Sequence, residues 1–328
     1  MTTKPTSKTL ARTEVVPSEA LAQLEPLAKQ VRELIGEAKS PRTRAAYKGD
    51  WARFELWCTG HGLSALPPHP ENVAAHLADL ANEGLKVSSI ERALAGIAFY
   101  FRASGFDWTT PKGVTEMMKG LRRRLGVRPT QKTPAVDAVL HAMVATFGVD
   151  LRGLRNRALF TVGWVGAFRR SDVVSLDVED VRFVPEGLIV LLRRSKTDQE
   201  GEGEEKGLPL AGNPAVCPVR SLRAWLQASD ITTGPIFRAI NAQGHVRDAR
   251  LSDRSVADFI KQAALAAGLD PSEFSGHSLR SGFATTAAQH GVPLHEIMSQ
   301  TGHKSERVAR GYVRHATLFQ RNAAKGLL

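Results

Sequence analysis

Apolar residues recur every three or four positions through the first third of the chain, the period of an α-helix that buries one face. The clearest case follows Ser40 and Pro41, a favourable N-cap and first-turn pair, after which Tyr47 and other aromatic residues form one stripe up to Gly60. We therefore expect a helix over 41–60, with Tyr47 facing the core. The same period predicts further helices over 21–36, 71–82, 88–103 and 111–125.

The helical pattern stops at the sequence VRPTQKTP, which begins at Val127 and contains two prolines. Proline lacks a backbone donor and disfavours helix in the residue before it, so this stretch predicts an extended connection. The N-terminal residues are polar and rich in Thr, Ser, Lys and Pro, which is typical of a mobile tail. We therefore expect a tail over 1–19, an all-helical domain over 20–126, a linker over 127–133 and a second domain over 134–328.

The second half of the chain mixes helical and β-rich patterns. Helices are expected over 135–147, 153–164, 214–228 and 252–267, with another beginning close to Arg169. The runs VRFV, GLIVLLRRSKT and KGLPL predict a small antiparallel sheet, with a hairpin rich in Gly and Glu from Asp198 to Gly207. After Tyr312 the sequence ATLFQRNAAKGLL predicts one last amphipathic helix. The expected fold class is mainly α with a small antiparallel β-sheet (α+β).

Positive charge exceeds negative charge, giving a formal net charge of +11 and an isoelectric point near 9.9. Such a balance favours a polyanionic partner, and without an amphipathic membrane anchor we expect nucleic acid rather than lipid. The basic residues gather in patches that suit contacts with a phosphate backbone. Those expected to bind DNA are Arg42, Arg44, Lys86, Arg122, Arg123, Arg124 and Arg128, and further patches contain Arg152, Arg155 and Arg157 and then Arg169 and Arg170.

No apolar run is long enough to span a bilayer, and the N-terminal sequence MTTKPTSKTLARTEVV lacks the apolar core of a signal peptide. We therefore expect a cytoplasmic protein. Cys58 and Cys217 have no His or Cys neighbour at metal-ligand spacing and are expected to be reduced structural thiols. Since His290, His295 and His315 lack an accompanying Cys or carboxylate set, we expect neither metal nor cofactor.

The segment from Gly276 to Tyr312 concentrates residues that suit chemistry on a phosphodiester. His277 and Arg280 are three positions apart, so on a helix they share a face and can address one ligand. The sequence GVP then breaks the helix, and Thr-Gly-His at 301–303 opens a further turn before Tyr312. Imidazole, guanidinium and phenol groups suit a phosphate ester better than a metal that prefers carboxylates. Each residue alone is also compatible with a structural role, as a core histidine or an ion-paired arginine.

Together these residues resemble the motifs of the tyrosine recombinases, the phage-integrase family of DNA strand-exchange enzymes that includes the Cre and Xer recombinases. The family pattern of Arg, any residue, Ser and an acid matches RRSD from Arg169 to Asp172, and its HxxR box matches HSLR from His277 to Arg280. The family's GH pair and its tyrosine follow at the expected spacing. The resemblance implies the catalytic set Arg169, Asp172, Lys196, His277, Arg280, His303 and Tyr312, with Lys206 as the fallback for the lysine.

The chain departs from the family at a few of these positions. Asp172 replaces the commoner Glu, and Ser281 and Gly282 follow Arg280 where many relatives carry His and Thr. Neither change removes a catalytic group. The first domain resembles the family's SAM-like core-binding domain only by pattern, as in SPRTRAAYKGDWARFELWC, so a Cre-like or Xer-like two-domain layout is implied.

The chemistry of phosphate esters is consistent with these assignments. A neutral phenol attacks poorly, so Tyr312 needs a proton acceptor, expected to be His277, and a strongly electrophilic phosphorus. The other expected roles are phosphate binding by Arg169 and Arg280, donation to the same phosphate by His303, protonation of the leaving 5′-oxygen by Lys196 and orientation of the basic cluster by Asp172. No metal or ATP is required, because the 3′-phosphotyrosyl bond retains the energy of the broken linkage.

The resemblance also implies partners on nucleoid-associated DNA in a prokaryote, or in the host of a phage or plasmid. These are double-stranded DNA sites, expected as inverted repeats around a short spacer, and copies of the chain in a homo-tetramer that exchanges strands through a Holliday junction. The final helix, over 316–328, is expected to dock on a neighbouring protomer, and no membrane partner is expected. Two alternatives stay open: DNA relaxation of the type IB topoisomerase kind, and a non-catalytic DNA-binding regulator on the same fold, which would have no reason to retain the whole set.

Overall fold

The computed structural model describes residues 27, 30, 39–127, 131–193 and 203–316 of the chain. The chain divides into two compact units, Met1–Pro129 and Thr130–Leu328. Several predictions lie outside the described residues: the tail over 1–19, nearly all of the helix over 21–36, Arg128, Lys196, and residues 317–328 of the final helix.

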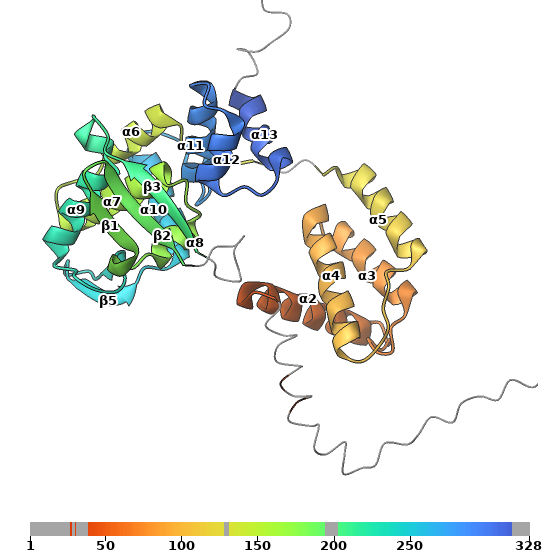
Figure 1. The fold of residues 1–328 in the computed structure, drawn as a ribbon. Helices are drawn as coiled ribbons and strands as arrows, with labels where there is room; N and C mark the ends of the chain where they lie inside the picture. Colours follow the sequence, from red (N-terminus) through yellow and green to blue (C-terminus); the bar gives the residue numbers. More distant parts are fainter. Residues whose placement is uncertain (1–26, 28–29, 31–38, 128–130, 194–202, 317–328) are drawn as a thin grey trace, which may run out of the picture. The chain divides into compact units, whose positions relative to one another are not determined.

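Helices form the first unit, namely α2 (Pro41–Gly60), α3 (Pro70–Asn82), α4 (Val87–Ala103) and α5 (Lys112–Leu125) (Figure 1). Helix α2 begins where expected, because the Ser40 hydroxyl accepts a hydrogen bond from the Thr43 N–H at 3.2 Å and Pro41 occupies the first turn. The helices share a core of buried apolar side chains, among them Trp51, Phe54, Leu77, Ile97, Phe101 and Met118.

Helices α2 and α4 approach each other closely at Gly96, where an added Cβ would lie 3.3 Å from the Cα of Tyr47. An ion pair joins the same two helices, since the Arg92 guanidinium donates two hydrogen bonds of 2.9 Å to the Asp50 carboxylate. Tyr47 itself is partly buried, with its ring centroid 5.6 Å from that of Phe99. The tyrosine therefore contributes to the packing between the two helices.

Helix α3 places an imidazole in the core of the first unit. His76 is 1% exposed, and its ring centroid lies 5.3 Å from that of Phe54 and 5.4 Å from that of Trp57. Within the described part of the chain, neither ring nitrogen has a hydrogen-bond partner. Burial, and after it the charge of Arg53, lowers the pKa of His76 to about 4, so the ring is neutral near pH 7.

The second unit begins with α6 (Asp137–Ala145), α7 (Leu151–Val165) and α8 (Arg170–Ser175). A three-stranded antiparallel sheet follows in the order β1 (Val181–Val184), β2 (Gly187–Leu192), β3 (Glu204–Pro209). Next come α9 (Pro218–Ser229), the strand pair β4 (Arg238–Ile240) and β5 (Val246–Arg250), and α10 (Asp253–Ala266). The last described elements are α11 (Ser278–Gln289), α12 (Leu294–Thr301) and α13 (Glu306–Ala316), which contact one another and are blue in Figure 1.

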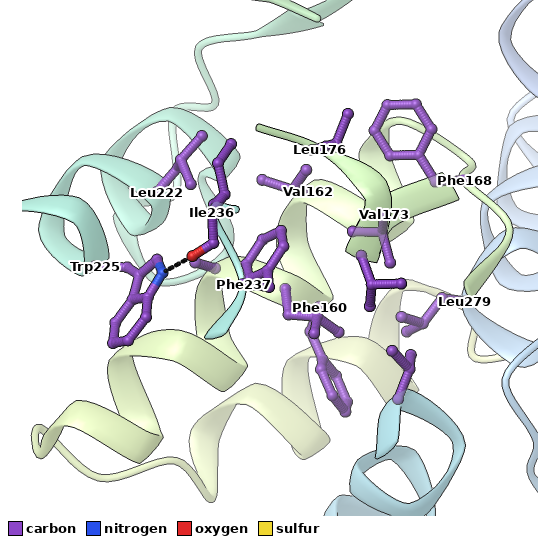
Figure 2. Close-up of a cluster of buried hydrophobic side chains, with 14 of the residues drawn as sticks. Phe160, Val162, Phe168, Val173, Leu176, Leu222, Trp225, Ile236, Phe237 and Leu279 are labelled. Carbon is purple, nitrogen blue, oxygen red and sulfur yellow. Dashed lines mark hydrogen bonds between the residues drawn. The ribbon is translucent and has the colours of Figure 1, made fainter. Parts of the chain in front are cut away.

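This architecture confirms the expected class, mainly α with a small antiparallel sheet. Helix α9 packs on α7 and on the sheet, and buried side chains fill the space between them (Figure 2). Trp225 of α9 is fully buried, and its indole N–H donates to the Ile236 carbonyl at 2.8 Å. Phe168, Val173 and Leu279 extend the same cluster to α8 and α11. These two helices carry predicted site residues, so the core fixes the elements that position them.

The structure corrects some of the sequence predictions. The β4–β5 pair was not expected, because most of β5 is exposed and its sequence VRDAR lacks a regular apolar alternation. Strand β3 begins at Glu204, earlier than the predicted run KGLPL, so the last residues of the predicted hairpin belong to the strand, where Lys206 lies opposite Val190. Arg155, expected in a DNA-contacting patch, is 4% exposed and lies 4.5 Å from the centroid of the Phe259 ring. Its charge is therefore part of the core. Among the described residues, no helix has both the length and the apolar character of a membrane span.

Candidate active site

The exposed side of the site is a histidine–tyrosine pair. His277 is the N-cap of α11 and is exposed, whereas Tyr312 lies on α13, which packs against α11, and is partly buried. The His277 Nε2 and the Tyr312 hydroxyl are 2.7 Å apart, within hydrogen-bonding distance. Burial raises the pKa of the Tyr312 hydroxyl, and the charges of Arg280 and Arg169 act in the opposite direction. The phenol thus has a neighbouring imidazole that can take its proton.

The buried side of the site centres on Arg280, in the first turn of α11. This side chain is 2% exposed, and its Nη1 donates to the Ala167 carbonyl at 2.7 Å. Ala167 has a φ of 48°, an uncommon value for a residue with a Cβ, in the turn that follows α7. Arg280 Nη2 also donates to Nε2 of His303 at 3.1 Å. Burial, followed by the charge of Arg169, lowers the pKa of Arg280 to about 10, which still leaves it charged near pH 7.

His303 follows the end of α12, where Gly302 adopts the left-handed conformation with φ 63° that commonly ends a helix. Its second ring nitrogen, Nδ1, lies 2.7 Å from the hydroxyl of Thr301, which is fully buried. Its ring centroid lies 5.7 Å from that of Tyr312. Burial, followed by the charges of Arg280 and Arg169, lowers the pKa of His303 to about 4.

Arg169 and Asp172 form the edge of the site at α8. Arg169 is the N-cap of that helix, and the Asp172 carboxylate accepts a hydrogen bond of 3.3 Å from its backbone N–H. The two side chains also form an ion pair with 3.5 Å between the nitrogen and oxygen atoms. Asp172 is 5% exposed, so it holds the Arg169 guanidinium from the protein side. Arg170 is the more exposed of the two arginines and pairs with Asp253 of α10 at 3.1 Å.

Lys206 brings a further cation to this site from β3. It is 5% exposed, its ammonium donates to the backbone carbonyl of Gln300, and it lies 3.5 Å from the Glu204 carboxylate. Burial lowers its pKa; Glu204 opposes this effect, while the charge of Arg280 adds to it. The side-chain amide of Gln300 donates in turn to the Val165 carbonyl at 2.8 Å. Gln300, which lies three residues before His303, therefore connects Lys206 of β3 to the end of α7.

The predicted residues are thus largely brought together. His277, Arg280, His303 and Tyr312 are connected by hydrogen bonds or ring contacts, and Arg169 and Asp172 lie near enough to influence the pKa of Arg280. Among the described residues, no group of three His, Cys, Asp or Glu side chains could hold a metal ion. The arrangement can bind an anion through guanidinium groups and can deprotonate a phenol.

Comparison with known proteins identifies the family. The model of the phage integrase family matches residues 136–318. The integrase/recombinase xerD homolog of Selenomonas ruminantium is 38% identical over 304 residues, which cover 91% of this chain and 89% of that protein. The chain belongs to the phage integrase family. It is therefore a tyrosine recombinase, an enzyme that cleaves and rejoins DNA strands.

Solved structures of tyrosine recombinases share the fold. The XerH site-specific recombinase bound to palindromic difH substrate aligns with a TM-score of 0.63 at 18% identity, covering 93% of this chain and 84% of that one. A lambda integrase tetramer bound to a Holliday junction aligns with a TM-score of 0.57 at 17% identity, covering 90% of this chain and 80% of that one. These alignments show a common fold.

The structure also adds residues that sequence reasoning had not placed in the site of this recombinase. Glu204, Gln300 and Thr301 were not predicted, although the last two directly precede the recognised Gly-His pair. Polar residues near the end of a helix usually face solvent, so their type gave no signal. A periodicity analysis of α12 would place Thr301 on the buried side with Ile297, four residues earlier.

The residues expected to bind DNA lie in the first unit. Arg42, Arg44, Lys86, Arg123 and Arg124 are exposed, and Arg122 is exposed but pairs with Glu91 at 2.7 Å. Their contact with DNA by this recombinase remains a prediction, which their exposure permits.

Proposed function

We propose that this tyrosine recombinase acts at specific DNA sites and uses Tyr312 as its nucleophile. The observation that carries the proposal is the 2.7 Å contact between the Tyr312 hydroxyl and His277 Nε2, beside the buried Arg280. The hydroxyl oxygen attacks the phosphorus and its proton passes to His277. The bond from phosphorus to the 5′-oxygen breaks, which leaves a 3′-phosphotyrosyl linkage. Attack by a 5′-hydroxyl from another strand then reverses these steps and returns the proton to Tyr312.

In this proposal Arg169 and Arg280 bind the nonbridging oxygens of the scissile phosphate. Charge builds on these oxygens in the transition state, and one well-placed donor contributes several kcal/mol to the rate. The five N–H groups of Arg280 support this role. One donates to Ala167 and one to His303, while the buried Nε has no partner within the described part of the chain. Donors thus remain for an anion, whose oxygens would satisfy a group that is costly to leave unpaired.

A lysine is proposed to protonate the departing 5′-oxygen, because an alkoxide leaves poorly in neutral water. Lys196 is the first candidate. Lys206 already donates to the Gln300 carbonyl and pairs with Glu204, so its ammonium is held by the protein. A substrate with sulfur in place of the bridging 5′-oxygen distinguishes Lys196 from Lys206. Its leaving group is a thiolate, whose conjugate acid has a pKa near ~8.5, so it leaves without being protonated. We expect this substrate to rescue Lys196→Ala and not Lys206→Ala; the reverse result would transfer the acid role to Lys206.

We also propose that the recombinase works as a tetramer on two paired sites, each an inverted repeat around a short spacer. The palindromic substrate of the XerH complex and the lambda integrase tetramer on a Holliday junction support this arrangement by similarity of fold. Selection of bound DNA from a random library tests it. Two half-sites in inverted order are expected, whereas a single unpaired motif would contradict the proposal.

The central test replaces the nucleophile. Tyr312→Phe removes one oxygen, so we expect normal binding to a nicked suicide substrate and no SDS-resistant protein–DNA complex. Tyr100→Phe is the matched control, because that ring stacks on Trp51 in the first unit at a centroid distance of 5.2 Å, and it should form the covalent complex normally. A covalent complex from Tyr312→Phe would place the nucleophile at another residue and overturn the assignment.

A further inference from the structure

The end of α7 is completed by a side chain from α12. The last four carbonyls of a helix have no partner within the helix. Backbone N–H groups of the turn that follows α7 donate to three of them, those of Val162, Gly163 and Trp164. The fourth carbonyl, of Val165, accepts a hydrogen bond of 2.8 Å from the side-chain amide of Gln300, 135 residues later in the chain. Gln300 therefore supplies the donor for this last carbonyl of α7.

The turn directly after Val165 has an unusual backbone. Ala167 has a φ of 48°, and a Cβ on Gly166 would lie 2.3 Å from the ring of Phe168. A locally disfavoured conformation of this kind persists only where surrounding contacts hold it. The Ala167 carbonyl accepts from Arg280 Nη1 at 2.7 Å. The direction in which Arg280 is held therefore depends on the contacts that keep this turn in place.

Gln300 is itself held from the opposite side by β3. Its backbone carbonyl, one of the last four of α12, accepts a hydrogen bond from the ammonium of Lys206. Lys206 is 5% exposed, and its ammonium lies 5.8 Å from the centroid of the Phe168 ring in the turn after α7. The main chain of Gln300 is thus fixed to β3, while its side chain reaches Val165.

We propose that Gln300 is a positioning residue for strand cleavage, which holds the turn after α7 so that the Ala167 carbonyl orients the Arg280 guanidinium. The inference rests on the proposed function in one respect, that Arg280 binds the scissile phosphate. Without the amide, the Val165 carbonyl loses its donor and Ala167 relaxes toward a more favourable φ. The donors of Arg280 then no longer point in one fixed direction, and misplacement of a binding group by about 1 Å lowers a rate as much as 10²-fold.

A role in packing alone makes a different prediction. Gln300 is partly buried in the last turn of α12, where a side chain also fills space. If filling space were its whole contribution, a side chain of the same shape would replace it, and the Arg280 guanidinium would not change. The two roles therefore differ in whether the amide hydrogens matter and in the state of Arg280.

The test compares two variants that lack the amide hydrogens. Gln300→Met keeps an unbranched side chain of similar length, whereas Gln300→Glu keeps the shape and presents oxygens, which only accept when ionised. We expect Gln300→Met to slow single-turnover cleavage of a suicide substrate about 10- to 100-fold with DNA binding unchanged, and Gln300→Glu to lose at least as much. Gln289→Met is the matched control. Gln289 is exposed at the end of α11, so this variant should cleave at the wild-type rate.

The ¹H–¹⁵N spectrum of the arginine side chains, in the full chain without DNA, measures the state of Arg280 directly. An Arg280→Lys variant assigns its signals. The hydrogen bond to Ala167 restricts rotation of the guanidinium, so we expect separate signals for the two Nη groups in the wild type. These signals should move toward one averaged signal in Gln300→Met and stay separate in Gln289→Met.

Several results would overturn the inference. It fails if wild-type Arg280 already gives one averaged signal, if either Gln300 variant cleaves at the wild-type rate, or if cleavage slows while the Arg280 signals stay as in the wild type. It also fails if both Gln300 variants unfold, because the residue would then serve the fold alone. A wild-type chain that forms no covalent complex with DNA would instead contradict the proposed function, and the spectrum would still show whether Gln300 orients Arg280.

Discussion

His76 in the first unit and His303 in the second share a pKa lowered to about 4, and burial is the largest cause in both. Their hydrogen bonds differ. Within the described part of the chain His76 has no partner for either ring nitrogen and lies between aromatic side chains. Both nitrogens of His303 are bonded, one to Thr301 and one to Arg280.

Two buried arginines of the second unit also share a lowered pKa and differ in their hydrogen-bond partners. Burial lowers the pKa of Arg155 and of Arg280 to about 10 in each case. Arg155 lies over the Phe259 ring, and its guanidinium donates to the side chain of Asn156 and the carbonyl of Arg238. Arg280 donates to the Ala167 carbonyl and to His303, which belongs to the Gly-His pair of the family motif. The lowered pKa of each arginine therefore reflects its burial. Which of the two takes part in the chemistry is indicated by the groups to which it is hydrogen bonded.

The largest effect should come from Arg280→Ala. Loss of one preorganised donor to the transition state typically lowers a rate by about 10²–10³, and we expect such a loss in single-turnover cleavage of a suicide substrate. Arg155→Ala is the matched control, since it also removes a buried guanidinium. It should lower the melting temperature and leave the cleavage rate of the folded protein unchanged. Equal loss of cleavage in both variants would remove the distinction drawn between the two arginines.

Packing next to the site gives the second prediction. A Cβ on Gly282 of α11 would lie 1.9 Å from the Ala135 carbonyl oxygen. Because the clashing atom belongs to the backbone, relieving this contact would require the backbone to move. We expect Gly282→Ala to destabilise the second unit by about 3 kcal/mol or more in urea unfolding. Gly120→Ala in α5 is the control, because an added Cβ there meets nothing within 4 Å. That variant should be neutral or stabilising by up to about 1 kcal/mol, and similar losses in both would contradict the clash.

The pH dependence of the first unit follows from His76. Its pKa of about 4 in the folded chain lies below the ordinary value of 6.5, so between these values the unfolded state binds the additional proton. The contribution to stability is complete above about pH 6.5 and is lost as the pH falls toward 4, by about 2 to 3 kcal/mol. Hydrogen exchange of α3 amides as a function of pH measures this loss. His76→Leu should make the profile flatter, and an unchanged profile would assign the effect to other groups.

The smallest effect is expected from His76→Leu at neutral pH. The imidazole is buried, and its nitrogens have no partner among the residues that the structure describes. Replacing it with an apolar side chain should stabilise the first unit by about 1 kcal/mol. Urea unfolding monitors the stability, and cleavage of the suicide substrate should stay at the wild-type rate. Loss of cleavage would mean that His76 is coupled to the reaction.

Local signals explain why much of the fold was predictable. Ser40 with Pro41 defines the start of α2 because capping depends only on neighbouring residues, and the apolar period carries through to Gly60. The β4–β5 pair was missed because its strands are short and mostly not buried, so the sequence shows little alternation. Here tertiary contacts, rather than local preference, determine the structure.

The site shows the same limit. His277 and Arg280 share a helical segment, so their spacing in sequence already predicted proximity. The contacts of Gln300 depend on groups far along the chain, Val165 and Lys206, which no local pattern connects to it. Arg155 shows the converse, since a charge in a basic patch of the sequence can still be buried over an aromatic ring.

The end of α7 has an electrostatic consequence for the cations of the site. The aligned peptide dipoles of this helix give its C-terminal end a partial negative charge, equivalent to roughly half an elementary charge. The carbonyls there, of Val165 and of Ala167 just beyond, accept hydrogen bonds from Gln300 and Arg280. This negative pole partly offsets the mutual repulsion of the positive groups around it. The cationic side chains are therefore already positioned before a phosphate binds, so binding does not have to bring them together.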